Sequence, residues 1–289
     1  MLQIPTTDLL INPDGSIYHL SLKPEHLADT VILVGDPDRV PEISWYFDRV
    51  EYVNRNREFV CHTGKFRNRR ITALSTGIGT DNIDIVLQEL DALVNVDFSR
   101  REINPVHKTL DIIRLGTSGA IQPDIPVNSL GLSTYGMGLD NLLYFYNDNS
   151  ISDIEMSDVF MEKSGWNIPN VRPYFIKGSE GLAKKFTEGV IRGITVTAPG
   201  FYGPQGRKLR INLADPAMIT RLQRFRFNDE RIINFEMETS ALYALGALLD
   251  HNVLTVCALI ANRATQSFCI DHKPVIKRLV ELVLETICQ

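Results

Sequence analysis

The sequence lacks the patterns that mark several common classes of enzyme. Its four cysteines, Cys61, Cys257, Cys269 and Cys288, form no CxxC pair, so neither a zinc site nor a redox dithiol is indicated. The six histidines show no HExxH spacing, and there is no GxSxG turn and no GxxxxGKS/T phosphate loop. These absences argue against metal-assisted hydrolysis, serine hydrolysis and nucleoside triphosphate hydrolysis.

Basic residues are too few to favour a nucleic acid partner. Thirty lysines and arginines against 35 acidic residues give a net charge of -5 and a pI near 5.7, which also argues against an anionic membrane surface. An anionic ligand would have to be held by a local cluster of arginines. No apolar run approaches the length of a membrane span, and the N-terminus lacks a basic start followed by an apolar run. We therefore expect a cytoplasmic protein.

Short β-branched runs alternate with helical patterns along the chain. The runs predict strands at residues 30–35, 71–77, 110–116, 193–200 and 253–263. Apolar residues spaced by three and four predict helices near 83–94, 237–249 and 276–287. This alternation predicts an α/β fold with a mixed, largely buried central sheet flanked by helices. No linker or repeat divides residues 1–289, so we expect a single domain, with loops at 146–153 and 165–173 in its least regular part.

Two arginines stand at strand ends, where ligands collect in α/β sheets. Arg39 follows a Gly-Asp-Pro turn, so the Gly35 N–H and the Arg39 guanidinium could face an oxyanion; a solvated arginine before a helix is the alternative. Arg114 lies inside an apolar strand, where an unpaired charge would be costly. Its partner is either a structural carboxylate or an anion held beside Thr117 and the glycine-rich turn that follows.

A third group of arginines enters the segment NRNREFVCHTG at 54–64. If that segment is one strand, alternation places Arg55 and Arg57 on one face together with Phe59. A solvated edge strand is the alternative for these side chains.

A pair of carboxylates stands where a strand meets a helix, at Glu236 and Glu238. Acidic residues in a first turn complement the helix dipole, and a carboxylate there can also accept hydrogen bonds from two adjacent hydroxyls. Met237 between them could pack against a sugar, although a core role is the alternative.

The segment GFYGPQGR at 200–207 combines flexible residues with an aromatic, an amide and a guanidinium. If the segment is extended, Gln205 and Arg207 point the same way. Phe201 offers a face against which a planar ring could pack.

Eight short motifs occur in an order, and at rough spacings, that resemble the nucleoside phosphorylase family, most closely its uridine phosphorylases. They are YHLSL, GDPDRV, NREF, STGIG, RLGTSGAIQP, FYGPQGR, NFEMETSAL and IANRATQ, and they run from Tyr18 to Gln266. The resemblance implies a nucleoside phosphorylase-like fold and the reversible phosphorolysis of uridine to uracil and ribose 1-phosphate. Phosphate would be the co-substrate, and no cofactor or metal would be required.

The resemblance also implies roles for individual residues. The phosphate site would comprise Gly35, Arg39, Arg114 and Thr117, completed by Arg57 of a neighbouring subunit. Ribose would be bound by Glu238, Met237 and the nearby Glu236, with His19 of the neighbouring subunit reaching the 5'-hydroxyl. The uracil pocket would comprise Phe201, Gln205, Arg207 and Arg263. Arg114, Arg207 and Glu238 would carry the catalysis.

The chemistry of a 2,4-dioxopyrimidine agrees with this pocket. Its edge presents an acceptor, a donor and an acceptor, which a glutamine amide and an arginine can read. The related purine enzymes place an aspartate, used as an acid, where Asn262 stands here. A purine or broad-specificity phosphorylase remains an alternative, as do a nucleosidase, which would not need Arg39, Arg57 and Arg114, and a non-catalytic nucleoside-binding protein.

Two departures from the family pattern concern the subunit interface. Some bacterial uridine phosphorylases hold a monovalent cation there through residues that match Glu58, Ile78 and Asn82; an asparagine is unusual at the last position, although it can offer an oxygen. The segments 95–109 and 136–190 diverge from typical bacterial members. Because such segments shape subunit contacts, we expect a homo-oligomer that is either a dimer or a hexamer built from dimers.

Overall fold

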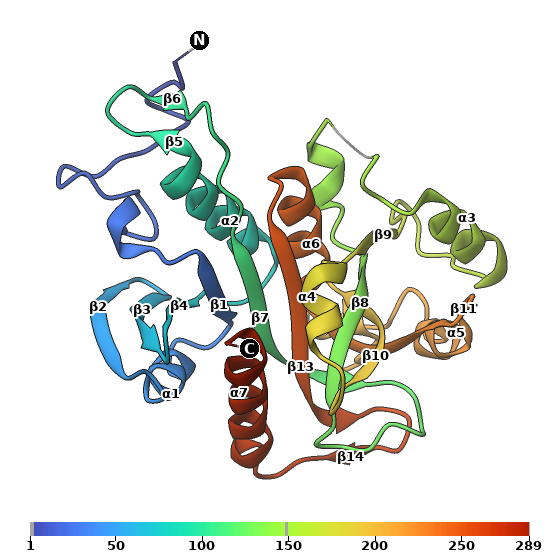
Figure 1. The fold of residues 1–289 in the computed structure, drawn as a ribbon. Helices are drawn as coiled ribbons and strands as arrows, with labels where there is room; N and C mark the ends of the chain where they lie inside the picture. The colour runs from blue at the N-terminus through green and yellow to red at the C-terminus, as the bar shows by residue number, and fades with distance from the viewer. Residues whose placement is uncertain (1–2, 148–149, 289) are drawn as a thin grey trace.

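A mixed β-sheet forms the centre of the molecule (Figure 1). The computed structural model describes residues 3–147 and 150–288. Within them the sheet runs in the order β11-β12-β10-β8-β13-β7-β1-β4-β3-β2, with β9 beside β8 and β14 beside β13. The bounds of these strands are β1 (Thr30–Val34), β2 (Arg49–Asn56), β3 (Phe59–Phe66), β4 (Arg69–Ser75), β7 (Asp111–Ala120), β8 (Leu130–Gly138), β9 (Tyr174–Lys177), β10 (Ile191–Thr197), β11 (Arg226–Phe227), β12 (Glu230–Glu236), β13 (Asn252–Asn262) and β14 (Ser267–Phe268). A separate hairpin joins β5 (Val96–Asp97) and β6 (Glu102–Ile103).

Five of the strands pair to form a closed ring. β12 pairs with β10, β10 with β8, β8 with β13 and β13 with β7, and β7 pairs in turn with the end of β12 through Phe235 opposite Gly119. The last residues of β7 and β12 therefore meet at one seam. Strands β1, β4, β3 and β2 extend the sheet beyond this ring.

Helices cover both faces of the sheet, because the central strands are apolar on both sides. In β1, Val31 and Leu33 join one core with α2 (Thr80–Asn95) and α6 (Thr239–Leu248). Ile32 and Val34 face a second core with α1 (Arg39–Ser44), α4 (Glu180–Lys185) and α7 (Lys273–Ile287). Each such buried side chain contributes about 2 kcal/mol of transfer free energy. The helices α3 (Ile154–Lys163) and α5 (Met218–Arg224) pack with β9, β10 and β12 around a third core.

The predicted strands and helices are confirmed, with boundaries shifted by a few residues. Within the expected irregular region, 165–173 is a loop, and so is the described part of 146–153, of which residues 148 and 149 lie outside the described range. The expectation of one strand over 54–64 was wrong. Arg57 and Glu58 form the turn between β2 and β3, with Arg57 at φ 55°, so Arg55, Arg57 and Phe59 do not share a strand face.

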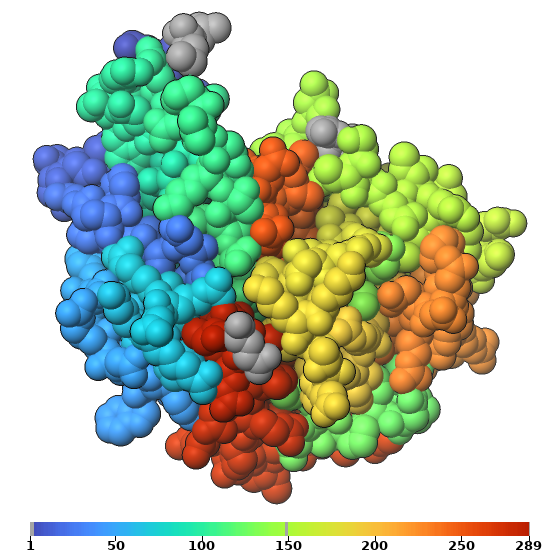
Figure 2. Space-filling model, in the orientation of Figure 1, coloured from blue at the N-terminus to red at the C-terminus, as the bar shows by residue number. Residues whose placement is uncertain are grey.

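The β5–β6 hairpin that follows α2 is tied to the N-terminal segment through Arg101. Ile4 donates its N–H to the Arg101 carbonyl at 2.8 Å, and Arg101 returns a hydrogen bond from Nε to the Ile4 carbonyl. Figure 2 shows these two segments, blue and green, forming one projecting part of the surface. Among the described residues, no helix is both long and apolar enough to cross a bilayer.

Candidate active site

A cavity of about 1190 Å³ opens where β1, β4, β7, β12 and β13 end. It brings together most of the residues that the sequence singled out. Those that line it are Gly35, Arg39, Arg114, Thr117, Phe201, Gln205, Arg207, Glu236, Met237, Glu238 and Arg263. Neither His19 nor Arg57 of the same chain lines it.

Arg39 is a buried guanidinium with few partners. It begins α1 after the Gly35–Pro37 turn, and its Nη1 donates to the Leu115 carbonyl at 3.3 Å. Burial lowers the pKa of Arg39; the nearby charge of Asp36 opposes this effect, and the charge of Arg114 adds to it. A guanidinium that has lost water without gaining a carboxylate would be stabilised by an anion in the cavity.

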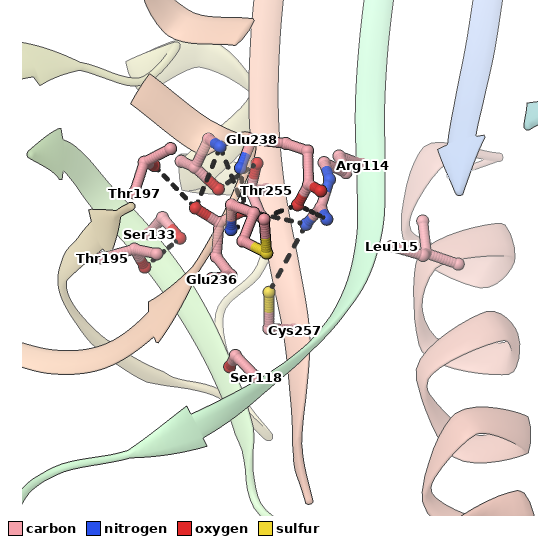
Figure 3. Close-up of polar contacts among 12 residues, drawn as sticks. Arg114, Leu115, Ser118, Ser133, Thr195, Thr197, Glu236, Glu238, Thr255 and Cys257 are labelled. Atoms are coloured by element: carbon pink, nitrogen blue, oxygen red, sulfur yellow. Dashed lines mark hydrogen bonds and ion pairs between the residues drawn. The ribbon is translucent and has the colours of Figure 1, made fainter. Parts of the chain in front are cut away.

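Arg114 bridges the two glutamates across the seam (Figure 3). Its Nη1 lies 3.2 Å from Glu236 Oε2, and its Nη2 donates to Glu238 Oε2. The guanidinium folds back over Gly116, where a Cβ would stand 2.2 Å from Arg114 Nη1. A structural carboxylate is thus one partner, as the sequence allowed. Arg114 Nε is buried without a hydrogen-bond partner among the described residues.

Glu236 is held by the start of α6. Its oxygens accept from Thr197 Oγ1 at 2.6 Å and from the Glu238 and Thr239 N–H groups at 3.0 Å. These contacts fit the helix-terminus interpretation of this carboxylate. They also fix the strand end from which Glu238 projects.

Glu238 is 4% exposed and links three elements of the cavity wall. Its Oε1 accepts from the Gly79 N–H at 2.8 Å, and its Oε2 accepts from Arg114 and from the Met237 N–H. Burial raises the pKa of Glu238 to about 7; the Arg114 charge opposes this rise and the Glu236 charge supports it. Two carboxylates that share one guanidinium in a buried site account for this balance.

The segment 200–207 is a turn, and the expectation of an extended segment was wrong. Gly203–Gln205 forms a short 3-10 helix, and Gly206 at φ 67° reverses the chain. The turn brings Gln205 and Arg207 into direct contact, since Arg207 Nη1 donates to Gln205 Oε1 at 2.5 Å and to the Phe201 carbonyl at 2.8 Å. The Arg207 guanidinium also lies 3.9 Å from the centre of the Phe201 ring, so it covers one face of that ring.

Arg263 holds this turn from the end of β13. Its Nη1 donates to the Gln205 carbonyl and its Nη2 donates to the Gly206 carbonyl at 3.1 Å. Burial lowers the pKa of both Arg263 and Arg207, and for Arg207 the charge of Arg263 adds to the effect. Two adjacent guanidiniums therefore present positive charge beside the buried Gln205 amide.

Asn262 is occupied by the backbone of two loops. Its Nδ2 donates to the Gln122 and Ile125 carbonyls at 2.8 and 2.7 Å, and its Oδ1 accepts from the Ala264 and Thr265 N–H groups. All its strong hydrogen-bonding directions are in use. An acid at this position would face two carbonyl oxygens.

Arg57 lines a second cavity of about 470 Å³ together with Tyr18 and Asn56, and His19 follows Tyr18 in the chain without lining this cavity. Arg57 is exposed in the β2–β3 turn, 5.7 Å from the centre of the Tyr18 ring, and Tyr18 packs edge-on against the His19 ring. Their absence from the main cavity is compatible with a role in a neighbouring subunit, which stays a prediction.

The residues expected around an interface cation are close together, but their donors do not suit a cation. Asn82 Nδ2 donates to Glu58 Oε1 at 3.3 Å, so an N–H points at the carboxylate. Asn82 Nδ2 is also packed over Gly77, where a Cβ would stand 2.4 Å away. A monovalent cation prefers oxygen ligands, and here an amide N–H group occupies one hydrogen-bonding direction of the carboxylate.

Asp91, His107 and His251 place ligand atoms within 4.8 Å of one another, as in a metal site. The His251 tautomer argues against one. His251 Nδ1 accepts the Leu110 N–H at 3.2 Å, so in the neutral ring Nε2 carries the hydrogen; Nε2 lies 3.3 Å from Asp91 Oδ1 without forming a hydrogen bond to a described group. Nε2 then has no lone pair for a metal.

Sequence reasoning missed several residues of the main cavity. Phe268 is 65% exposed on β14, and Asp36, Ser118, Phe235 and Gln266 also line the wall. Gln266 has φ 54° in the turn that returns the chain as β14. Only the motif IANRATQ pointed to this turn, and no alternation of apolar residues marked Phe268.

Comparisons with known proteins show what the chain as a whole is similar to. The sequence model of the phosphorylase superfamily matches residues 29–286. A uridine phosphorylase from Thermococcus kodakarensis is 31% identical over 258 residues, which cover 88% of this chain and 80% of the relative. A DeoD-type purine nucleoside phosphorylase from Buchnera aphidicola is 25% identical over 274 residues, covering 93% and 98%.

Solved structures include a nucleoside phosphorylase from Trypanosoma brucei described as showing uridine phosphorylase activity. Its TM-score with this chain is 0.86 at 29% identity, covering 97% of this chain and 99% of that one. The chain is thus similar, over most of its length, to proteins named for uridine and to proteins named for purine nucleosides.

Proposed function

This chain belongs to the phosphorylase superfamily, and we propose that it is a cytoplasmic enzyme that cleaves uridine with phosphate, giving uracil and ribose 1-phosphate. Membership confirms the resemblance drawn from the eight motifs. The choice of uridine over a purine nucleoside is the finer proposal. One observation carries it: the pairing of Gln205 with Arg207 inside the main cavity.

The Gln205–Arg207 pair supports a uracil pocket because Arg207 fixes the orientation of the amide. A guanidinium only donates, so its hydrogen bond identifies the amide atom beside it as Gln205 Oε1. That oxygen retains a lone pair for the N3–H of uracil, and Nε2 can donate to a flanking carbonyl. Arg207 can donate to another uracil oxygen, while Phe201 offers its uncovered face to the ring.

Phosphate would be bound at the arginine end of the cavity. Arg39 has a single hydrogen bond to a backbone carbonyl, and Thr117 Oγ1 has no hydrogen bond to any described group. Arg114 already shares its charge between two carboxylates. The site of one chain therefore offers little net positive charge to a phosphate dianion. This supports the proposal that Arg57 of a neighbouring subunit completes the site.

The reaction would proceed by displacement at C1' with oxocarbenium character in the transition state. A phosphate oxygen bonds to C1' while the C1'–N1 bond breaks and its electron pair leaves with uracil. Arg207 and Gln205 would stabilise the negative charge on the leaving base, and the proton of the hydrogen phosphate dianion finally resides on uracil. Glu238 would accept hydrogen bonds from the ribose hydroxyls, with Met237 packed against the sugar and Glu236 fixing the strand end.

A purine phosphorylase is the alternative, because DeoD-type purine enzymes are among the relatives. The commitment of Asn262 to four backbone partners speaks against an acid at that position. A nucleosidase would not need the arginine cluster.

The test is to measure release of the base from uridine, 2'-deoxyuridine, thymidine and inosine with and without added phosphate. We expect uracil release from uridine to require phosphate, and inosine to be a poor substrate. Equal rates in phosphate-free buffer would contradict a phosphorylase, whereas inosine turnover above that of uridine would contradict the pyrimidine assignment alone.

We propose phosphate as the co-substrate and no obligatory cation, since the Asn82 amide N–H faces Glu58. The same assay with choline in place of potassium and sodium should give an unchanged rate, and a loss that potassium restores would contradict this. We further propose a homo-oligomer that contains at least the dimer needed to bring Arg57 and His19 to a neighbouring cavity.

A further inference from the structure

The turn that carries His19 is anchored by a single carboxylate of α2. Glu89 accepts from the His19 N–H at 3.0 Å through Oε1 and from the Leu20 N–H at 2.8 Å through Oε2. Glu89 Oε1 also lies 2.6 Å from His19 Nδ1. The Glu89 side chain is 12% exposed and that of His19 is 25% exposed, so these contacts are largely shielded from water.

The opposite side of the same turn is held by β2. Asn56 Nδ2 donates to the His19 carbonyl at 2.7 Å, and Asn54 Nδ2 donates to the Leu20 and Ser21 carbonyls at 3.1 Å. Both the donors and the acceptors of the turn are thus satisfied by side chains. The backbone hydrogen bonds alone hold residue 19 in place. The additional contact between Glu89 Oε1 and the imidazole ring therefore needs a separate explanation.

The contact with the ring determines which nitrogen of His19 carries the hydrogen. A carboxylate only accepts, so the 2.6 Å contact places a hydrogen on Nδ1. In the neutral imidazole, Nε2 is then the acceptor. No described group is hydrogen-bonded to Nε2 of His19, so this nitrogen is available to accept a hydroxyl hydrogen.

We propose that Glu89 is a positioning residue for substrate binding: it holds His19 as the Nδ1–H tautomer, so that Nε2 accepts the 5'-hydroxyl of the nucleoside bound to a neighbouring subunit. This inference rests on the proposed function and on the assignment of His19 to the ribose. Glu89 itself touches no substrate. Its effect therefore passes entirely through the orientation and the tautomer of His19.

The experiment compares uridine with 5'-deoxyuridine, which lacks only the hydroxyl in question. The wild-type oligomer should prefer uridine in kcat/KM by a factor on the order of ten, as expected for one well-oriented hydrogen bond. In Glu89→Gln, the amide can turn its NH₂ toward Nδ1 and impose the other tautomer. We expect this variant and His19→Ala to lose the preference, with 5'-deoxyuridine kinetics close to wild type.

The double variant Glu89→Gln/His19→Ala should be no worse than His19→Ala, because Glu89 acts only through the imidazole. Gln88→Ala is the matched control: Gln88 is the neighbour of Glu89 on α2 and contacts Tyr146 instead of the turn. It should retain the preference for uridine. An equal loss on both substrates in Glu89→Gln would show that Glu89 only anchors the turn, and would overturn the proposal.

A second measurement is made on the wild-type protein and uses a variant only to assign the signal. Nitrogen-15 spectra of the histidine rings in the wild-type oligomer, with His19 assigned by its loss in His19→Gln, should show the Nδ1–H tautomer in the neutral ring. A hydrogen on Nε2 would overturn the proposal. Absence of phosphate-dependent uracil release would instead contradict the proposed function, while leaving the tautomer of His19 as a separate observation.

Discussion

At the scale of single residues, the wall of the cavity places two buried carboxylates around one buried guanidinium. Glu236 accepts hydrogen bonds from the backbone N–H groups at the start of α6. Glu238 has fewer donors and shares Arg114, and burial raises its pKa to about 7. Glu238 should therefore bind a proton in the folded protein at pH values where it is ionised in the unfolded chain.

This difference predicts a pH-dependent stability. The folded-state pKa of Glu238 lies above its unfolded value of 4.5. The stabilisation of the folded state by proton binding to Glu238 is therefore complete below pH 4.5 and is lost as the pH rises through about 7. The slope approaches about 1.4 kcal/mol per pH unit. Glu238→Gln cannot titrate, so its stability relative to wild type should improve between about pH 5 and about pH 7 in urea unfolding. Glu188→Gln changes an exposed carboxylate that has no hydrogen bond to a described group, so its free energy of unfolding should depend on pH as that of wild type does. If the free energy of unfolding of Glu238→Gln also ran parallel to that of wild type, the prediction would be contradicted.

The sequence could indicate these residues but not their pairing. An arginine inside an apolar strand indicates an anionic partner, and a carboxylate at a strand–helix junction is typical of a helix N-terminus. That Arg114 meets Glu236 and Glu238 depends on the seam between β7 and β12, which join residues more than a hundred positions apart. Local patterns carry no information on such a contact.

At the scale of elements, the turn at 200–207 is a rigid unit that is held from outside. Its own hydrogen bonds from Gln205, Gly206 and Arg207 close it locally. Arg263, at the end of β13, then fixes two of its carbonyls. The position of the Gln205 amide thus depends on an element that is distant in sequence.

Arg263→Ala should consequently damage recognition of the base and spare phosphate. Loss of two charge-assisted hydrogen bonds should raise KM for uridine about tenfold, with KM for phosphate nearly unchanged. Steady-state kinetics with each substrate varied in turn measure both constants. Arg210→Ala, at an exposed arginine of the following loop without a hydrogen bond, is the control. A matching rise in both constants would show that Arg263 does more than hold the turn.

Glycine and turn chemistry limit what a sequence indicates at this scale. Alternation correctly predicted the buried strands, whereas it misled at 54–64 and at 205–207, where single residues at positive φ reverse the chain. A non-glycine residue such as Arg57 in that conformation gives no local warning. The sheet order, with its closed ring, likewise follows from pairing between distant strands.

At the scale of the whole molecule, the phosphate site is proposed to be composite. Arg39 and Arg114 line the main cavity, whereas Arg57 lines a separate cavity of the same chain and His19 lines neither. Two chains arranged about a two-fold axis can each complete the cavity of the other.

Mixed oligomers test this arrangement. Arg39→Ala damages the chain that owns the cavity, and Arg57→Ala damages the chain that completes it, so each variant alone should be nearly inactive. A heterodimer of the two contains one intact site and should recover about half of the wild-type activity. Co-expression with two affinity tags isolates it. A heterodimer of Arg39→Ala with Gln205→Ala, both on the owning side, should recover nothing, and equal recovery in both pairs would refute trans completion by Arg57.

The closed ring of five strands has a consequence for how such a protein can change over evolutionary time. The arginine and the glutamates that fasten its seam are also the groups that line the cavity, so a substitution there alters folding and chemistry together. The turn at 200–207 lies outside the ring and can vary without loosening it. Substitutions in this turn can therefore change the base preference without disturbing the ring of strands. Substitutions in the anion-binding wall would also disturb the seam that closes the ring.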